Sequence, residues 1–221
     1  MNNFPVIAVD GPSASGKGTV AQLVANRLGF HYLDSGALYR IVAFAAKQKN
    51  IAWSDALAVT ECAKTLSIEF VGEQVLLNNQ DVSNEIRTEE IGKGASQVAV
   101  HAPLRAALVN MQRSFCKAPG LVADGRDMGT VIFPEAALKV FLTASTETRT
   151  KRRYQQLLGK NQAANYESIL QDLTERDARD KNRASAPLLM AEDAILLETD
   201  NVSISDAVDF ILQKYQTQQN T

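Results

Sequence analysis

The chain has 221 residues, 45% of them hydrophobic, and a formal net charge of −2. This length is enough for one sizeable core, and the charge excludes a global positive field that would draw the protein to nucleic acid or an anionic membrane. No apolar run approaches the roughly 20 residues of a membrane helix, and no secretory signal pattern precedes the first predicted strand. We therefore expect a cytoplasmic monomer that binds neither nucleic acid nor membrane.

The first part of the chain alternates between strand and helix patterns. A short apolar run leads into a glycine-rich loop, and the helical spacing that follows is closed by Gly29. Ser54 is expected to cap a third helix, because serine stabilises helix starts. The expected elements are strands at 5–9 and 30–33 and helices at 19–28, 37–47 and 54–64.

The sequence pattern changes in the middle of the chain. Two strand-like runs at 66–71 and 74–77 are separated by Gly72 and Glu73, which predicts a β-hairpin. Helices are expected at 88–100 and 103–116, the second opened by Pro103, whose missing N–H costs nothing at a helix start. The hairpin and its flanking helices are expected to form an insertion at about 65–101.

Strand and helix patterns alternate again in the last hundred residues. Five apolar strands separated by helices predict a five-stranded parallel sheet with helices on both faces. The chain is expected to form a single domain over 1–221. The further expected elements are strands at 121–123, 138–142 and 194–197 and helices at 146–158, 166–180 and 205–215.

The stretch DGPSASGKGT at 10–19 has the context of a phosphate-binding loop, because it follows a strand and opens a helix. Its glycines let successive N–H groups point at one anion, and the lysine and the helix N-terminus add positive charge. The sequence therefore predicts that ATP phosphates are bound by Gly11, Pro12, Ser13, Ala14, Ser15, Gly16, Lys17, Gly18 and Thr19.

The loop departs from the common pattern, in which a serine or threonine follows the lysine directly. Gly18 intervenes here, so the hydroxyl falls on Thr19, rotated by roughly 100° around the helix. We expect Mg²⁺ to be held by nucleotide oxygens and waters, with a distant carboxylate ordering those waters.

A phosphate-binding loop occurs both in kinases of small acceptors and in GTP-binding switches. A switch should carry an Asn-Lys-x-Asp guanine reader, and the sequence has none; DKNR at 180–183 is a scramble of those letters. The kinase class is therefore favoured, although a nucleotide-binding protein without catalysis stays possible.

Basic residues gather in the second half of the chain, where 146–183 hold nine of the 23 lysines and arginines. An acceptor that is itself a phosphate needs cations rather than a general base. On the helix from Tyr166, the stripe that contains Ile169, Leu170 and Leu173 continues through Arg176, Asp177, Asp180 and Arg183, which is typical of a helix that runs from core into a cleft. The alternative is a solvated helix end with i, i+4 ion pairs.

A second basic helix, TETRTKRRYQQL at 146–157, precedes the loop-like stretch GKNQAANY at 159–166. This position suits a short lid at about 150–166 that closes over the donor phosphates. Arg149 and Arg153 are therefore predicted to bind ATP.

Six motifs together resemble the nucleoside monophosphate kinases, and within them the bacterial-type cytidylate kinases. They cover nearly the whole chain and follow the order of that family. The motifs are DGPSASGKGT, LDSGALYR at 33–40, DVSNEIRTEEI at 81–91, ASQVA at 95–99, ADGRDMGTVIFP at 123–134 and ERDARDKNRASAPL at 175–188.

The resemblance implies a sheet of the P-loop NTPase type and a single kinase domain over 1–221. It also implies ATP- and Mg²⁺-dependent phosphorylation of CMP and dCMP to CDP and dCDP, by direct transfer between two bound nucleotides. It implies that Asp127, Arg105 and Ser96 read the cytosine, whose amino donor and ring acceptors match those groups. Lys17, Arg126, Arg183 and Asp124 are implied in catalysis, and Asp124 is expected to hold magnesium through water. The implied acceptor-binding residues are Ser35, Tyr39, Arg40, Ser96, Arg105, Gly125, Arg126, Asp127, Arg176, Asp180 and Arg183, of which Arg176 and Asp180 are expected near the ribose.

Two alternatives stay open at this point. One is a kinase of the same fold with another acceptor, such as UMP. The other is a nucleotide-regulated binding protein.

Overall fold

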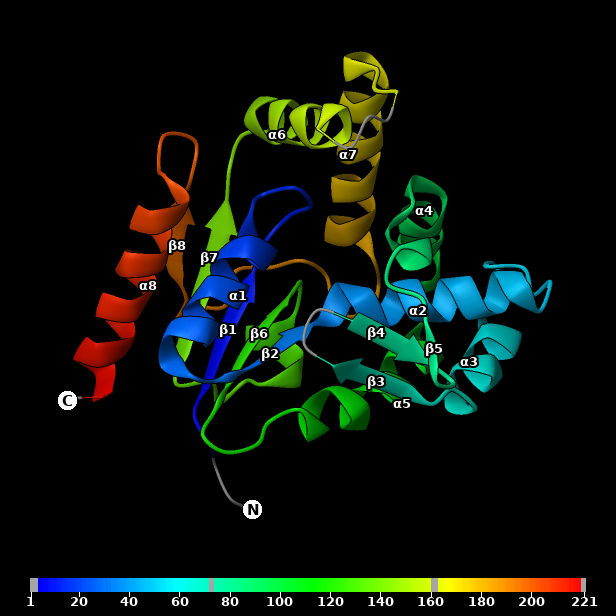
Figure 1. The fold of residues 1–221 in the computed structure, drawn as a ribbon, viewed down its shortest axis with the longest axis horizontal. Coiled ribbons are helices and arrows are strands. Elements are labelled where there is room, and N and C mark those ends of the chain that lie inside the picture. Colours follow the sequence, from blue (N-terminus) through cyan, green and yellow to red (C-terminus); the bar gives the residue numbers. More distant parts are fainter. Residues whose placement is uncertain (1–3, 72–73, 160–162, 220–221) are drawn as a thin grey trace. The chain divides into compact units, whose positions relative to one another are not determined.

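The computed structural model describes residues 4–71, 74–159 and 163–219. The chain divides into two compact units, one of Met1–Asp34 with Arg113–Thr221 and one of Ser35–Gln112 (Figure 1). The insertion expected at about 65–101 lies inside the second unit. A single kinase domain over the whole chain stays a prediction.

The first unit is built on a parallel sheet, which confirms the predicted fold class (Figure 1). The strand order is β2-β6-β1-β7-β8, and every neighbouring pair runs parallel. β1 and β6 are buried along their whole length, as expected of apolar strands inside a parallel sheet. The strands are β1 (Val6–Asp10), β2 (His31–Asp34), β6 (Leu121–Gly125), β7 (Leu138–Thr143) and β8 (Ile195–Glu198).

Two helices of this unit share one core with the sheet. α1 (Lys17–Leu28) contributes Val20 and Val24, and α8 (Ile204–Gln219) contributes Val208 and Ile211. These side chains pack with buried residues of four strands, namely Ile7, Val9, Val122, Val140, Leu142 and Leu197. The apolar periodicity of both helices is therefore explained by this layer.

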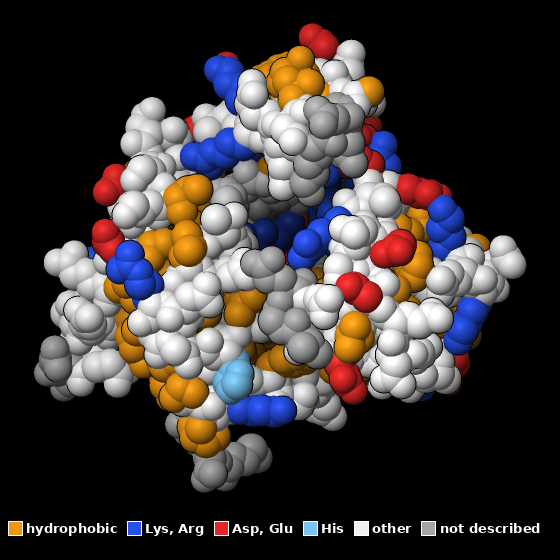
Figure 2. Space-filling model, in the orientation of Figure 1, with side chains coloured by type: hydrophobic (Ala, Val, Ile, Leu, Met, Phe, Trp, Pro, Cys, Tyr) orange, Lys and Arg blue, Asp and Glu red, His pale blue; other side chains and the backbone are white. Residues whose placement is uncertain are grey.

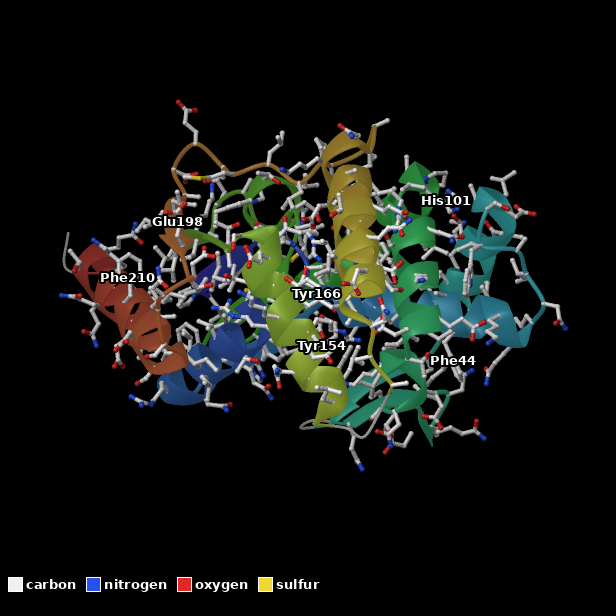
Figure 3. The ribbon with its side chains drawn as sticks, turned by 90° about the horizontal axis from the view of Figure 1, so that it is seen from above. Phe44, His101, Tyr154, Tyr166, Glu198 and Phe210 are labelled. Atoms are coloured by element: carbon white, nitrogen blue, oxygen red, sulfur yellow. The ribbon has the colours of Figure 1, made fainter. Side chains whose placement is uncertain are left out.

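The other two helices of the unit pack on each other. α6 (Thr146–Leu158) and α7 (Tyr166–Asn182) share a small apolar cluster of Leu157, Ile169 and Leu173. The rings of Tyr154 and Tyr166 meet edge to face at 6.2 Å between centroids (Figure 3). Part of the predicted lid, 160–162, lies outside the described residues.

The strand register brings acidic residues to one edge of the sheet. Asp34 at the end of β2 pairs with Asp124 of β6, and Asp10 at the end of β1 pairs with Gly125. The carboxyl ends of parallel strands are where such sheets place their ligands. The sheet therefore gathers these carboxylates beside the phosphate loop, which follows β1.

The second unit combines helices with a small antiparallel sheet. β3 and β4 pair as the predicted hairpin, in the register Ile68 with Leu77; the two residues between them lie outside the described ranges. α2 packs on both α3 and α4. The elements are α2 (Ser35–Gln48), α3 (Ala56–Lys64), β3 (Ile68–Val71), β4 (Gln74–Leu77), β5 (Gln80–Asp81), α4 (Glu89–Val98) and α5 (Ala102–Ser114).

Two local expectations for this unit were wrong or incomplete. The cap of α3 is Asp55, whose side chain accepts the N–H of Ala58 at 3.0 Å, and not Ser54. Both residue types cap helices well, so the sequence does not choose between neighbours. The hairpin is extended by β5, a two-residue polar strand that has no apolar alternation to reveal it.

Charged side chains of both signs are interspersed on the face that Figure 2 displays. This agrees with a net charge near zero and with local, rather than global, recognition of anions. Among the described residues, none of the helices is long and apolar enough to cross a membrane.

Candidate active site

The phosphate loop of the first unit depends on two glycines. At Gly11, with φ +156°, a Cβ would lie 1.9 Å from the carbonyl oxygen of Leu142, so no side chain fits. Gly16 has φ +91°, a left-handed conformation that favours glycine, and α1 begins at the next residue. The loop backbone therefore turns directly into the helix N-terminus, where N–H groups point towards an anion.

Lys17 is the first residue of α1 and is buried. The pKa of its ammonium group is lowered to about 8, chiefly by burial and also by Arg126, while Asp124 and Asp34 oppose the shift. The ammonium lies 3.5 Å from the carbonyl oxygen of Pro12. Lys17 is thus a buried cation at the phosphate loop that can pair with a phosphate.

A pocket of about 420 Å³ opens at this loop, within the size range of small-molecule sites. Besides the loop, it is lined by α6 and by the segment that joins β8 to α8. The sequence predicted Arg153 at the ATP site but not the residues at 199–207, because these lie far from the loop along the chain. The lining residues outside the loop and α1 are Arg152, Arg153, Gln156, Thr199, Val202, Ser203, Ile204 and Ala207.

Arg152 connects the two sides of this pocket. Its guanidinium donates to the carbonyl oxygen of Ser15 at 3.1 Å, to Oγ1 of Thr199 at 3.0 Å and to the carbonyl oxygen of Thr199. The position of Thr199, directly after a parallel strand, is the signal that could have found this side of the site.

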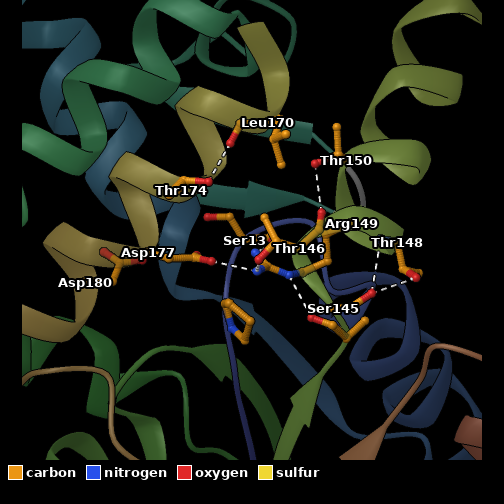
Figure 4. A network of polar contacts seen from close by, with 12 residues as sticks. Ser13, Ser145, Thr146, Thr148, Arg149, Thr150, Leu170, Thr174, Asp177 and Asp180 are labelled. Carbon is orange, nitrogen blue, oxygen red and sulfur yellow. Dashed lines mark hydrogen bonds and ion pairs between the residues drawn. The ribbon is translucent and has the colours of Figure 1, made fainter. Parts of the chain in front are cut away.

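Arg149, which was predicted to bind ATP, contacts the phosphate loop and α7 (Figure 4). Its buried side chain donates to the carbonyl oxygen of Ser13 at 3.1 Å and forms an ion pair with Asp177 of α7 at 2.6 Å. Two further bonds reach the carbonyl oxygen of Ala144 and Oγ1 of Thr146, both at 2.9 Å. In this structure, Arg149 therefore ties the phosphate loop to α6 and α7, and a contact with ATP stays a prediction.

A pair of acidic residues, Asp124, which is buried, and Asp34, which is half-buried, lies beside the loop. Asp124 accepts a hydrogen bond from the Tyr32 hydroxyl at 2.8 Å and is paired in the sheet with Asp34. Burial and the neighbouring Asp34 raise the pKa of Asp124 to about 6, although Lys17 and the Tyr32 hydroxyl lower it. The pair offers carboxylate oxygens, which are the ligand type that Mg²⁺ prefers.

The same carboxylate explains the unusual glycine after Lys17. A Cβ on Gly18 would lie 3.0 Å from Oδ2 of Asp124 and 3.5 Å from the Tyr32 hydroxyl. Asp124 therefore fills the space that a serine or threonine would occupy in the common loop. The shift of the hydroxyl to Thr19 is therefore linked to the presence of the Asp124 carboxylate beside Gly18.

Charged residues that directly follow β6 meet charged residues at the end of α7 in a second cluster within the same unit. Arg126 forms an ion pair with Asp180 at 2.8 Å and donates to Oγ of Ser13 at 2.7 Å. Arg183 lies 3.6 Å from Asp127, and both side chains are buried. Burial raises the pKa of Asp180, but Arg126 and Arg176 outweigh it and hold the pKa below its usual range. The cluster is thus a dense set of paired charges at the end of β6.

The structure bears out the predicted change of character along α7. Ile169 and Leu173 are buried in the apolar cluster, whereas Asp180 and Arg183 face the cluster of charges. Leu170, which the spacing placed on the same stripe, is exposed. The arginines of this stripe are therefore not the solvated end of a helix.

The remaining predicted acceptor residues lie in the second unit. The Arg105 guanidinium lies 5.5 Å from the centroid of the Tyr39 ring, a cation–π contact. Arg40 donates to the carbonyl oxygen of Ile86 at 2.9 Å, and Gly92 leaves space for its guanidinium, which a Cβ would approach to 3.1 Å. Ser35, the first residue of α2, and Ser96 of α4 are both buried.

Comparisons with known proteins extend over almost the whole chain. Residues 7–217 match the family model described as cytidylate kinase. A cytidylate kinase of Chromobacterium violaceum is 54% identical over 215 residues, which cover 97% of each chain, and one of Burkholderia multivorans is 58% identical over 211 residues, which cover 96% of this chain and 92% of the relative.

Solved structures of similar fold are more distant in sequence. An uncharacterized protein from Eubacterium ventriosum has a TM-score of 0.53 at 15% identity, covering 97% of this chain and 99% of its own. A gluconokinase from Sinorhizobium meliloti has a TM-score of 0.50 at 15% identity, covering 98% of this chain and 94% of its own. At this identity, the likeness concerns the fold alone.

Proposed function

The chain belongs to the cytidylate kinase family, and on that premise we propose that it transfers the γ-phosphoryl group of ATP to CMP or dCMP, giving ADP and CDP or dCDP. The observation that carries the proposal is the family match over residues 7–217. The phosphate loop and its pocket give it a physical basis, since a kinase must hold a polyphosphate by local groups in a protein without a strong positive field.

The pocket at the phosphate loop takes ATP in this proposal. The loop N–H groups and Lys17 bind the phosphates, and Arg153 lies on the pocket wall where it reaches them. Thr199, Val202 and Ile204, from the segment after β8 and the start of α8, also line the pocket, and the nucleoside would pack there. Arg152 keeps the two sides together through its bonds to Ser15 and Thr199.

Mg²⁺ fits beside this loop. Asp124 is the residue that would hold it, through water, because its carboxylate lies against the first turn of α1 where the common loop has a hydroxyl. When bound, the ion would neutralise charge on the phosphate oxygens. Tyr32 fixes the orientation of the Asp124 carboxylate through its 2.8 Å hydrogen bond.

Arg126 and Arg183 are proposed to bind the acceptor phosphate, together with Arg40 and Ser35. Arg126 donates one hydrogen bond to Asp180, its ion-pair partner, and two to neutral acceptors, the Ser13 hydroxyl and the Gly125 carbonyl. Exchanging neutral acceptors for a phosphate dianion strengthens the hydrogen bonds of a guanidinium. These cations offset the repulsion between two negatively charged substrates, and a phosphate acceptor needs no general base.

Asp127, Arg105 and Ser96 are proposed to read the cytosine edge. A carboxylate accepts from the cytosine amino group, whereas uracil presents a carbonyl oxygen at that place. Facing a carboxylate with a carbonyl leaves both without a donor, and a buried mismatch of this kind discriminates strongly. Arg176 and Asp180 are proposed near the ribose, with Tyr39 beside Arg105.

We further propose that the protein works as a monomer in the cytoplasm. The large apolar side chains that stay exposed come from separate elements, for example Leu23 of α1 and Leu57 of α3. Scattered exposed residues of this kind are normal on monomers. Light scattering of the purified protein tests this point, and a dimer mass would contradict it.

A panel of acceptors tests the activity. ADP release is measured with ATP, Mg²⁺ and CMP, dCMP, UMP, AMP, GMP or shikimate in turn. The proposal predicts efficient turnover with CMP and dCMP and weak turnover with the others. A preference for UMP would overturn the acceptor assignment, and no turnover with any acceptor would favour a nucleotide-regulated binding protein.

A further inference from the structure

Asp10, the last residue of β1, is a buried carboxylate for which the proposed reaction has no task. Its two oxygens accept hydrogen bonds from two consecutive backbone N–H groups, Oδ1 from Met128 and Oδ2 from Gly129, each at 2.8 Å. Each N–H has its own oxygen atom. Such a pairing fixes the position of a backbone segment in two directions at once.

The segment that Asp10 holds follows β6 directly. Residues Met128–Ile132 form a single wide helical turn, in which the N–H groups of Val131 and Ile132 donate to the carbonyl oxygen of Asp127. The first N–H groups of a helical turn have no acceptor inside the turn. Asp10 supplies the acceptor for two of them, from a different strand.

The turn is confined on another side by β7. A Cβ on Gly129 would lie 3.1 Å from the side chain of Lys139 and 3.5 Å from Oδ2 of Asp10. Gly129 is therefore enclosed between these two side chains. The backbone immediately after Asp127 has little room to shift while both are present.

We propose that Asp10 is a positioning residue, whose carboxylate holds the Met128–Gly129 backbone and thereby keeps Asp127 and Arg126 where they contact CMP. This inference rests on the proposed roles of Asp127 and Arg126 and extends them to a residue that touches no substrate. Asp127 immediately precedes the held segment, and Arg126 precedes Asp127, so a shift of the turn moves both.

The chemistry requires a carboxylate rather than an amide at position 10. An asparagine has one acceptor oxygen, and its amide nitrogen would face the second N–H as donor against donor. The pKa of Asp10 is raised to about 6, chiefly by burial and also by Asp127. The hydrogen bonds from Gly129 and Met128 and the charge of Arg126 oppose this rise. The carboxylate is therefore ionised at neutral pH, when both N–H groups are bound.

Asp10→Asn tests the inference kinetically, with Asp55→Asn as a matched control that removes a carboxylate charge but retains a capping oxygen at α3. We expect Asp10→Asn to lower kcat/KM for CMP by about tenfold, the cost of a buried unsatisfied N–H, and to narrow the preference for CMP over UMP. The KM for ATP should stay within about twofold, because the altered segment lies after β6. The control should retain wild-type values.

Two results would overturn the inference. One is an unchanged kcat/KM for CMP together with an unchanged CMP to UMP ratio. The other is a raised KM for ATP with that ratio unchanged, which would assign Asp10 to the phosphate loop that follows it.

A double variant separates this inference from the proposed role of Asp127. If Asp10 affects base selection through Asp127, adding Asp10→Asn to Asp127→Asn leaves the CMP to UMP ratio of Asp127→Asn unchanged. A further fall in the ratio would contradict that route. If Asp127→Asn alone keeps the wild-type ratio, the proposed recognition of the base by Asp127 is wrong. The positioning role of Asp10 is then tested by kcat/KM for CMP and by the NMR measurement described next.

Backbone amide NMR tests the same inference on the wild-type protein, so the test does not depend on whether a variant folds. The amide protons of Met128 and Gly129 should be shifted by their carboxylate acceptor and should titrate together with an apparent pKa near 6. The charged groups around this carboxylate are Asp127, Arg126 and Lys139. If the amide shifts of both residues do not change between pH 5 and 8, a range that includes the pKa of about 6, the proposed role of the Asp10 carboxylate is refuted.

Discussion

Gly18 stands where a common phosphate loop carries the hydroxyl residue that follows the lysine. The sequence alone showed the departure, but the reason lies in Asp124, whose carboxylate oxygen would be 3.0 Å from a Cβ at this position. Asp124 comes from a strand more than a hundred residues later, so no local pattern could reveal the relation. Gly18 and the Asp124 carboxylate therefore depend on each other within the site.

Gly18→Ala should lower kcat by about tenfold, because Asp124 must move away from the added methyl group and misplacements well below 1 Å already slow a positioned reaction. Steady-state turnover with saturating ATP and CMP measures the effect. Wild-type turnover in this variant would show that the place of Asp124 beside α1 has no bearing on the reaction.

Lys17 gives a prediction for the pH dependence. Its pKa is lowered to about 8, so the free enzyme loses the ammonium charge as the pH rises through about 8 and keeps it below. Because kcat/KM reports the free enzyme, kcat/KM for ATP should fall on the alkaline side of pH 8. Lys17→Arg, whose guanidinium stays charged, should be slower but lack this alkaline fall; the same fall in the variant would assign it to another group.

At the scale of elements, α6 and α7 show what periodicity can and cannot predict. The bounds of α6 were predicted to the residue, and α7 extends two residues beyond its expected end, to Asn182. The buried Ile169 and Leu173 follow from spacing, but the partners of Arg149 do not. Arg149 was predicted to bind ATP because a basic helix before a loop-like stretch suits a lid, and this contact stays a prediction. The pairing of its buried guanidinium with Asp177 and with the loop carbonyl of Ser13 is what periodicity did not reveal.

The ion pair of Arg149 and Asp177 is expected to stabilise the join of α6 and α7. Their side chains are only 4% and 14% exposed, so Asp177→Ala leaves a buried guanidinium without its counter-ion and should cost about 3 kcal/mol in the free energy of unfolding. Urea denaturation measures this change.

Glu147→Ala on α6 is the matched control for that loss. It removes an ion pair with Lys151 whose side chains are 70% and 66% exposed, and it should cost less than about 1 kcal/mol. Equal losses in the two variants would mean that the buried pair contributes no more than an exposed one.

The remaining misses at this scale have local physical causes. β5 consists of Gln80 and Asp81, too short and too polar to show alternation. The wide turn at Met128–Ile132 is held by Asp10 from another strand, and tertiary contacts of this kind leave no periodic signal. The wall of the nucleotide pocket between β8 and α8 was missed for a related reason, since Thr199 becomes meaningful only once its strand is placed in the sheet.

Over the whole molecule, the net charge of −2 means that long-range attraction contributes little to binding two nucleotides. Recognition must come from buried local groups, and the first unit supplies them as paired charges: Arg126 with Asp180 and Arg183 near Asp127. Ion pairs of this kind keep cations in place in the absence of substrate. They also make discrimination between bases depend on single side chains.

The most direct test of this account is the ratio of kcat/KM for CMP to that for UMP, in the wild type and in Asp127→Ala. We expect a strong preference for CMP in the wild type and a clearly smaller one in the variant, because the carboxylate that opposes the uracil carbonyl is gone. Equal efficiency with both acceptors in the wild type would contradict the assignment of the acceptor. An unchanged ratio in the variant would remove Asp127 from the recognition of the base.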